Sequence, residues 1–149
     1  MIQVQKHPPN WNEIKKYMPD YAENGIFAWG VMLYNPKGLP IDPGTLAHEE
    51  MHSEQQFLYG GDAFKYKILP KQRYKDWWNR YLRDKSFWLA MELPAYQKQY
   101  WELEKAIKDR NKLNNFATLF AKELSREGLL TTSDALKAIQ SNKLIKFNV

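Results

Sequence analysis

The sequence predicts an α+β protein in which one small sheet near the N-terminus packs beside several helices. Apolar residues alternate along residues 25–34, as in a strand, whereas from residue 42 almost to the end they recur at helical spacing. The chain has 149 residues, of which 44% are hydrophobic and 15% aromatic, enough to fill one core. No repeat or linker divides it, so we expect a single domain over residues 1–149.

The first elements are expected between turns rich in Pro, Asn and Gly. Such turns at residues 7–10 and 36–40 bracket a helix over Trp11–Tyr17 and a strand over Gly25–Tyr34. Both faces of this strand are apolar, so we expect it to be covered on both sides. Gly30 would allow a close backbone approach, and by analogy with β-augmentation we expect the strand edge to accept an extended peptide.

The clearest helix is predicted after Asp42-Pro43, where an N-cap acid precedes proline at the first helical position. The two glycines at residues 60–61 should end this helix. Further helices are expected over Tyr74–Arg83, Ser86 to about Leu113, Phe116–Arg126 and Ser133 to about Gln140, with a kink or a break at Pro94.

Composition excludes several kinds of site. The chain has no cysteine, which rules out a disulfide framework, a zinc ribbon, an iron–sulfur cluster and a cysteine nucleophile. Any metal ion must therefore be held by histidine and carboxylate. The sequence shows no signal peptide and no membrane-spanning segment, so we expect a cytoplasmic protein without a membrane partner.

The motif His48-Glu49-Glu50-Met51-His52 lies on the best-defined helix. Its two histidines are four residues apart and share one helical face, where both can reach a single ion. Chance predicts roughly 0.004 such pentapeptides in a chain of this composition. Glu49 is turned about 100° from His48 and can lie beside the ion as a general base, whereas Glu50 points further round as a surface acid. The alternative is a pair of surface histidines on a solvated helix.

A catalytic zinc site usually has three protein ligands, so a third must be found. The candidates are His7 and the carboxylates. We favour Glu92, because it lies in a strongly apolar segment where an unpaired carboxylate would be costly. The alternative is an exposed Glu92 paired with Lys85 or Lys98. Tyr96, one turn further on, could orient a ligand or hydrogen-bond to an oxyanion, or be an ordinary packed tyrosine.

Together, His48, Glu49, His52 and the downstream Glu92 with Ala95-Tyr96 resemble the zincin metallopeptidases of gluzincin type. In that family a glutamate on a second helix supplies the third zinc ligand. The resemblance implies a minimal zincin-like domain with zinc bound by His48, His52 and Glu92. Larger gluzincins often have an acid four residues after this glutamate, where Tyr96 stands here.

The wider pattern is similar to small zincin-like proteins of phages and bacteria over most of residues 6–140. It includes Trp29-Gly30, Gln55-Gln56 and Trp77-Trp78. A phage-encoded protein would act in the host cytoplasm. The resemblance implies a fold and a metal, and the substrate is not carried over with them.

Charge is unevenly distributed. Residues 42–62 carry five acids and no Lys or Arg, whereas residues 63–96 carry eight basic residues against three acids, a net charge of +5. The basic residues are Lys65, Lys67, Lys71, Arg73, Lys75, Arg80, Arg83 and Lys85. This stretch is either a solvated face beside aromatic core residues or a docking surface for an acidic partner or nucleic acid.

Three functions follow as hypotheses. The leading one is a zinc-dependent hydrolase, a metallopeptidase acting on a peptide or protein substrate, with Glu49 as general base. The rival is a non-catalytic zinc-binding structural or interaction protein that meets partners through its basic aromatic surface. Nucleic-acid binding is the least favoured. Zinc is the default ion, but cobalt, nickel, iron or manganese also fit such ligands.

Overall fold

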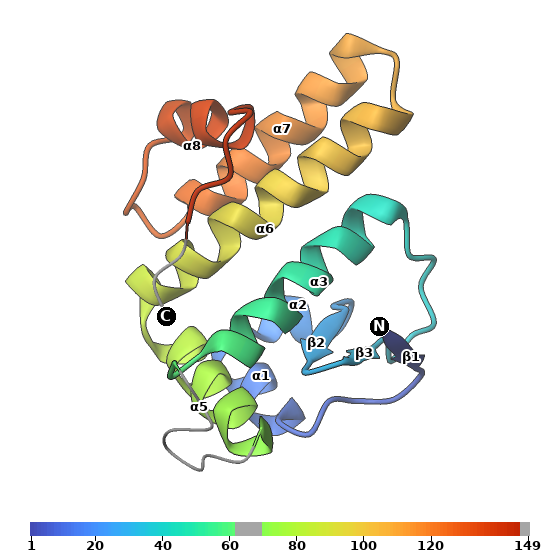
Figure 1. Ribbon diagram of the computed structural model, residues 1–149, viewed down its shortest axis with the longest axis vertical. Coiled ribbons are helices and arrows are strands. Elements are labelled where there is room, and N and C mark those ends of the chain that lie inside the picture. The colour runs from blue at the N-terminus through green and yellow to red at the C-terminus, as the bar shows by residue number, and fades with distance from the viewer. Residues whose placement is uncertain (62–69, 147–149) are drawn as a thin grey trace.

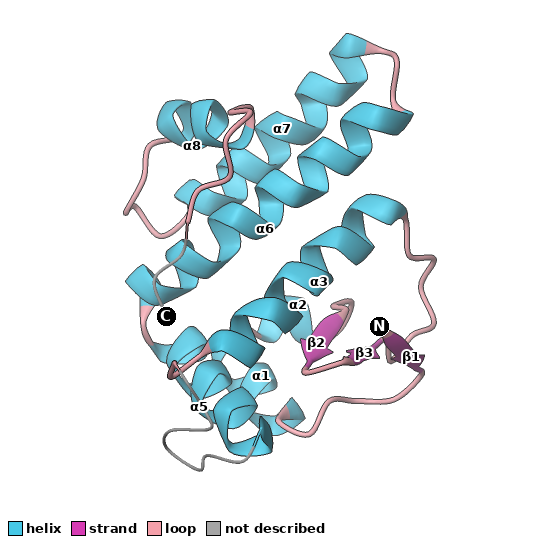
Figure 2. Ribbon diagram, viewed as in Figure 1, coloured by secondary structure: helices cyan, strands magenta, loops and turns pink. Residues whose placement is uncertain are grey.

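The computed structural model describes residues 1–61 and 70–146 and has the predicted α+β architecture (Figure 1). A three-stranded sheet near the N-terminus lies against helices, and the described part of the chain contains seven of them (Figure 2). The strands are β1 (Ile2–Val4), β2 (Phe27–Trp29) and β3 (Met32–Tyr34). The helices are α1 (Trp11–Tyr17), α2 (Pro19–Ala22), α3 (Pro43–Leu58), α5 (Pro70–Arg83), α6 (Lys85–Ala106), α7 (Arg110–Ser125) and α8 (Thr132–Ile139).

The expected single strand over residues 25–34 is wrong. It is a hairpin, in which β2 pairs antiparallel with β3 and Trp29 lies opposite Met32. Gly30 reverses the chain with a positive φ of 56°. A Cβ atom there would come within 2.4 Å of the Tyr74 ring, so the turn also needs glycine for space. Apolar alternation continued through the turn and concealed it.

β1 and the short helix α2 were not predicted from the sequence. β1 pairs in parallel with β3, so the sheet order is β1-β3-β2 and β3 is central. Three exposed or half-exposed residues at the N-terminus carry no periodic signal. β1 forms because the backbone of β3 provides hydrogen-bond partners for it.

The helix starting at Asp42 is confirmed. The Asp42 carboxylate accepts a hydrogen bond from the backbone N–H of Thr45 at 3.0 Å, and α3 ends before two glycines with positive φ. Likewise, α1 has its predicted bounds.

The expected continuous helix from Ser86 to Leu113 is wrong, because α6 ends at Ala106 and α7 begins at Arg110. The Asp109 carboxylate accepts the N–H groups of Asn111 and Lys112, which fixes the start of α7. Pro94 lies inside α6 and does not end it.

Two clusters of buried side chains form the interior. The aromatic core joins the sheet, α1, α5 and the start of α6 and comprises Ile14, Ala22, Phe27, Tyr34, Trp77, Trp78, Tyr81, Phe87, Trp88 and Met91. The helical core lies between the later part of α6, α7 and α8 and comprises Tyr100, Leu113, Ala117, Ala121, Leu124, Ala135 and Ile139. Within the described residues, no helix is long and apolar enough to cross a membrane.

Candidate metal centre

Helices α3 and α6 lie side by side between the two cores and carry the histidines and glutamate of the motif (Figure 1). His48 and His52 come from α3 and Glu92 comes from α6, and all three are buried. Gly44 permits this close approach, because a Cβ atom there would come within 3.0 Å of the Leu103 side chain and 3.2 Å of the Gln99 carbonyl oxygen on α6. The two helices therefore bring into contact residues some 40 positions apart in the sequence.

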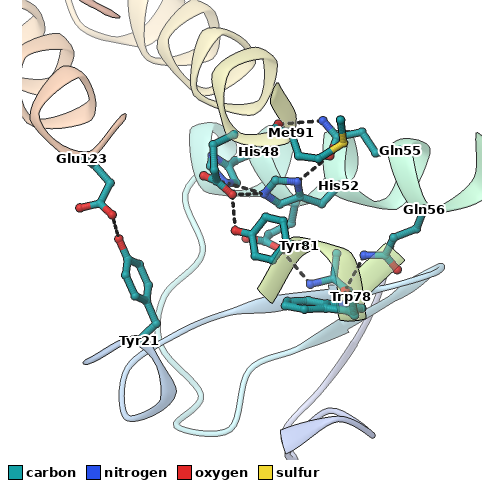
Figure 3. A network of polar contacts seen from close by, with 12 residues as sticks. Tyr21, His48, His52, Gln55, Gln56, Trp78, Tyr81, Met91 and Glu123 are labelled. Carbon is teal, nitrogen blue, oxygen red and sulfur yellow. Dashed lines mark hydrogen bonds and ion pairs between the residues drawn. The ribbon is translucent and has the colours of Figure 1, made fainter. Parts of the chain in front are cut away.

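The three side chains converge on one point (Figure 3). His48 Nε2 and His52 Nε2 are 3.0 Å apart. Glu92 Oε2 lies 3.5 Å from His48 Nε2, and Glu92 Oε1 lies 3.0 Å from His52 Nε2. Ligands bound tetrahedrally to zinc at the usual bond lengths are about 3.3 Å from one another. This buried His-His-Glu group could therefore hold one metal ion, and its donor atoms suit zinc.

A buried glutamine fixes the orientation of His52. Gln55, which is fully buried, donates from Nε2 to the Met91 carbonyl oxygen at 2.8 Å. Its Oε1 therefore faces His52 Nδ1, at 2.9 Å, as an acceptor. His52 then carries its proton on Nδ1, which leaves Nε2 free as a ligand atom. Sequence analysis noted the Gln55-Gln56 pair but gave it no role.

Tyr81 on α5 holds Glu92, a role that the sequence pattern containing Tyr81-Leu82 did not indicate. Its hydroxyl donates a hydrogen bond to Glu92 Oε1 (Figure 3). The ring stacks on Trp77 with centroids 4.7 Å apart and meets the His52 ring edge-on. Burial and the neighbouring Glu92 charge raise the pKa of Tyr81 well above its usual value, so the hydroxyl stays a donor. No spacing in the sequence links a tyrosine on one helix to a glutamate on the next.

Electrostatic interactions in the triad outweigh the cost of burying its charges. Burial alone would raise the pKa of Glu92, but the positive charges of His52 and His48 hold it well below its usual range. Burial alone would lower the pKa of His52, but Glu92 raises it to about 9. Without a metal ion, His52 and Glu92 thus form a buried ion pair, and a metal ion must displace the histidine proton.

Glu49 lies beside the triad and does not belong to it. Its Oε2 accepts the backbone N–H of Ala28 at 2.8 Å, and Oε1 has no hydrogen-bond partner among the described residues. Burial raises the pKa of Glu49, against the opposing effect of His52 and His48. Glu49 is thus a buried carboxylate that lines the same cleft as the triad and has one oxygen without a partner among the described residues. Glu50 is exposed, as expected.

The remaining candidates are placed elsewhere or differently. His7 is exposed, stacks on Trp11 with centroids 4.1 Å apart, and is not part of the group that could hold a metal ion. Tyr96 packs its ring edge-on against His48, with centroids 4.7 Å apart. Its hydroxyl has no hydrogen-bond partner in the described part of the chain, so Tyr81 has the polar contact with a ligand that Tyr96 was expected to make.

The outer edge of β2 is already occupied, contrary to the expectation that it accepts a peptide. Ala28 donates its N–H to Glu49, and its carbonyl oxygen accepts from Gln56 and from the Trp78 indole. Gly30 donates to Gln56 and accepts from the Ser53 hydroxyl. Side chains of α3 and α5 thus bind the groups that a peptide would need at residues 28–30.

A cleft of about 510 Å³ opens onto the triad and Glu49. Its walls come from α2 and the segment before β2 on one side and from α7 on the other, with Tyr21 and Glu123 hydrogen-bonded across it (Figure 3). Most of its remaining lining is apolar or aromatic, and the described residues contribute no lysine or arginine to it. Among the described residues, Glu123 is the one lining carboxylate besides Glu49 and Glu92.

The basic stretch does not form a continuous unpaired surface. Lys65 and Lys67 lie outside the described residues. Arg73 is buried and donates to the Phe57 carbonyl oxygen, Arg80 pairs with Asp84, and Arg83 pairs with Glu13. The three arginines of α5 are therefore engaged within the molecule, whereas Lys71 and Lys75 are exposed.

Comparisons of the chain with protein-family models, with curated proteins and with solved structures find no match. The buried His-His-Glu group, the free oxygen of Glu49 and the cleft above them are therefore the features that bear on function.

Proposed function

We propose that this protein is a zinc-dependent hydrolase that cleaves peptide bonds. The observation that carries the proposal is the convergence of His48, His52 and Glu92 beside a carboxylate, Glu49, that is not a ligand. A purely structural zinc site has no use for such a carboxylate and usually fills all four positions with protein ligands. Here the described residues provide three ligands and a cleft.

Each residue of the site would have a separate role in peptide-bond hydrolysis. Bound at the triad, a divalent ion would polarise a carbonyl group and lower the pKa of a water molecule. Glu49 would accept the proton of the attacking water at Oε1 and pass it to the leaving amine, while the Ala28 N–H holds Oε2 in place. Gln55 and Tyr81 would keep His52 and Glu92 in position.

The first test is metal content. Purified protein should contain about one equivalent of zinc, and the Glu92→Ala variant should lose most of it. Glu102→Ala, on the same helix but paired with Lys105 at the surface, is the matched control and should keep its metal. Equal metal content in the parent and in Glu92→Ala would reject the triad.

The second test separates hydrolysis from metal binding. The zinc-loaded parent and Glu49→Gln are incubated with a peptide mixture of defined composition, and cleavage is followed by mass spectrometry. Glu49→Gln should keep its zinc and lose activity by at least 100-fold, whereas the exposed neighbour variant Glu50→Gln should stay active. Cleavage unchanged in Glu49→Gln would remove Glu49 from the mechanism. No cleavage by the zinc-loaded parent would favour a non-catalytic zinc protein.

A further inference from the structure

A second cavity of about 420 Å³ adjoins the cleft above the triad. The two hollows share three lining residues, Met18, Tyr81 and Trp88. Tyr81 also hydrogen-bonds to Glu92, so the dividing wall includes a residue in direct contact with the candidate metal ligands. A ligand that reaches the triad through the cleft would therefore lie beside the second cavity.

The two hollows differ in charge. Three cationic side chains and one carboxylate line the second cavity: Arg83, Lys85, Arg126 and Glu127. Their formal sum is 3 − 1 = +2. The cleft has no lysine or arginine among its described lining residues, and its carboxylates lie beside His48 and His52. An anionic group on a bound ligand would thus be favoured in the second cavity.

The cations of the second cavity can change partners at little cost. Glu127 lies between Lys85, at 2.6 Å, and Arg126, at 3.7 Å, and the Lys85 side chain is 69% exposed. Exposed ion pairs of this kind contribute little to stability. Arg126 also pairs with Glu123, at 2.9 Å. A ligand carboxylate could therefore take the place of Glu127 beside Lys85 and Arg126 while the pair of Arg126 with Glu123 remains.

Trp88 forms the aromatic part of the wall between the two hollows. Its indole ring lines both hollows and is only 5% exposed, yet its N–H has no hydrogen-bond partner among the described residues. The Arg126 guanidinium lies 4.9 Å from the centre of the same ring. The ring thus gives the second cavity an aromatic wall against which Arg126 is held.

We propose that the second cavity is a subsite for a carboxylate of the substrate, bound by Lys85 and Arg126. This proposal rests on the proposed hydrolase function and narrows its substrates to peptides with a carboxylate close to the cleaved bond. The carboxylate belongs either to an acidic side chain or to a free C-terminus, and both present the same group to the cavity.

Three matched probes test the subsite on zinc-loaded protein. Each is a dipeptide with an N-terminal metal-binding hydroxamate: one ends in glycine amide, one in glycine with a free carboxylate, and one in aspartate amide. Affinities are measured by calorimetry at low salt. We expect at least one anionic probe to bind about tenfold more tightly than the neutral probe, and the better of the two identifies the source of the carboxylate.

Variants then assign the preference to the cavity. Lys85→Gln should reduce the advantage of the anionic probe about threefold or more and leave the affinity of the neutral probe unchanged. Lys105→Gln is the matched control, since Lys105 lies at the other end of α6, is also 69% exposed and pairs with Glu102. Equal binding of all three probes, or a preference unchanged in both Lys85→Gln and Arg126→Gln, would overturn the subsite and leave the hydrolase proposal standing. Failure of even the neutral probe to bind would overturn both.

Discussion

The two cores of this protein differ in the size of their side chains and in the polar groups beside them. The aromatic core is built from large rings, and it adjoins buried polar groups: His48, His52, Gln55, Gln56 and Glu92. The helical core has fully buried alanines at positions 117, 121 and 135 between α6, α7 and α8. Rings with polar edges can surround a charged group and still supply donors, whereas small side chains let helices pack closely. The buried group that could hold a metal ion therefore lies against the first core, whereas the second core packs helices closely against one another.

Removal of metal should have the largest effect, and it should act through the aromatic half. With free zinc at about a thousandfold its dissociation constant, binding stabilises the protein by about 4 kcal/mol. Chelation should therefore lower the melting temperature of the zinc-loaded parent by about 10 °C in calorimetry. Glu92→Ala should show no such drop. An unchanged melting temperature in the parent would mean that the triad holds no metal.

A cavity in the helical core should destabilise the fold without touching the site. Leu124 is fully buried, so Leu124→Ala should reduce the free energy of unfolding by about 3 kcal/mol, measured by urea titration. Its zinc affinity should stay within about twofold of the parent. Leu129→Ala, at a residue 48% exposed, is the control and should cost less than about 0.5 kcal/mol. Weakened zinc binding in Leu124→Ala would show that the two halves are coupled.

Two adjacent glutamines sharpen the comparison within the aromatic half. Gln55 orients His52, whereas Gln56 binds the edge of β2, and both are fully buried. Gln55→Met should weaken zinc binding about 10- to 100-fold, measured by competition with a chelating dye. Gln56→Met should lower stability and change zinc affinity much less. Equal zinc affinities in the two variants would show that Gln55 does not orient His52 for zinc binding.

The metal-free protein should lose stability as the pH rises. Glu92 raises the pKa of His52 in the folded protein to about 9, against an ordinary value of 6.5. The ion pair therefore stabilises the fold fully below pH 6.5 and loses this contribution as the pH rises through 9. Thermal melts of chelated protein across this range should show the decline, and Glu92→Gln should flatten it. A decline of the same size in Glu92→Gln would have another origin.

The cap of α7 gives the smallest expected effect. Asp109→Ala removes the acceptor for two backbone N–H groups and should cost about 1 kcal/mol, with hydrogen exchange increased at the start of α7. Asp109→Asn keeps an acceptor and should stay close to the parent. Increased exchange around His48 in Asp109→Ala would contradict the separation of the two halves.

Sequence predicted the fold class, the N-cap at Asp42 and the three members of the triad, because each leaves a local signal. The motif on α3 depends on helical spacing, and the burial of Glu92 was indicated by its apolar neighbours. The hairpin turn at Gly30, strand β1 and the break before Asp109 were missed. Apolar alternation runs through the turn at Gly30, β1 depends on a partner distant in the sequence, and the break before Asp109 depends on a cap within a helical pattern.

The surroundings of the triad were harder to predict than its members. Tyr81 and Gln55 act through contacts between helices, and only the packing of α3, α5 and α6 determines which polar side chains meet. Tyr96 was favoured because it lies one turn from Glu92, but a shared helical face does not determine where a hydroxyl points. Periodicity identifies candidate ligands, and tertiary packing selects the groups that orient them.

The anchor of Glu49 is a main-chain amide, so the hydrogen bond itself does not depend on the side chain at position 28. Any of the nineteen residues with an amide hydrogen can donate at position 28, and only proline lacks one. The position of the proposed base, Glu49, thus depends on the backbone path of β2, and the identity of residue 28 does not reveal it. Ala28 is only 1% exposed, so space limits the side chain at this position, while its amide holds Glu49 Oε2 at 2.8 Å.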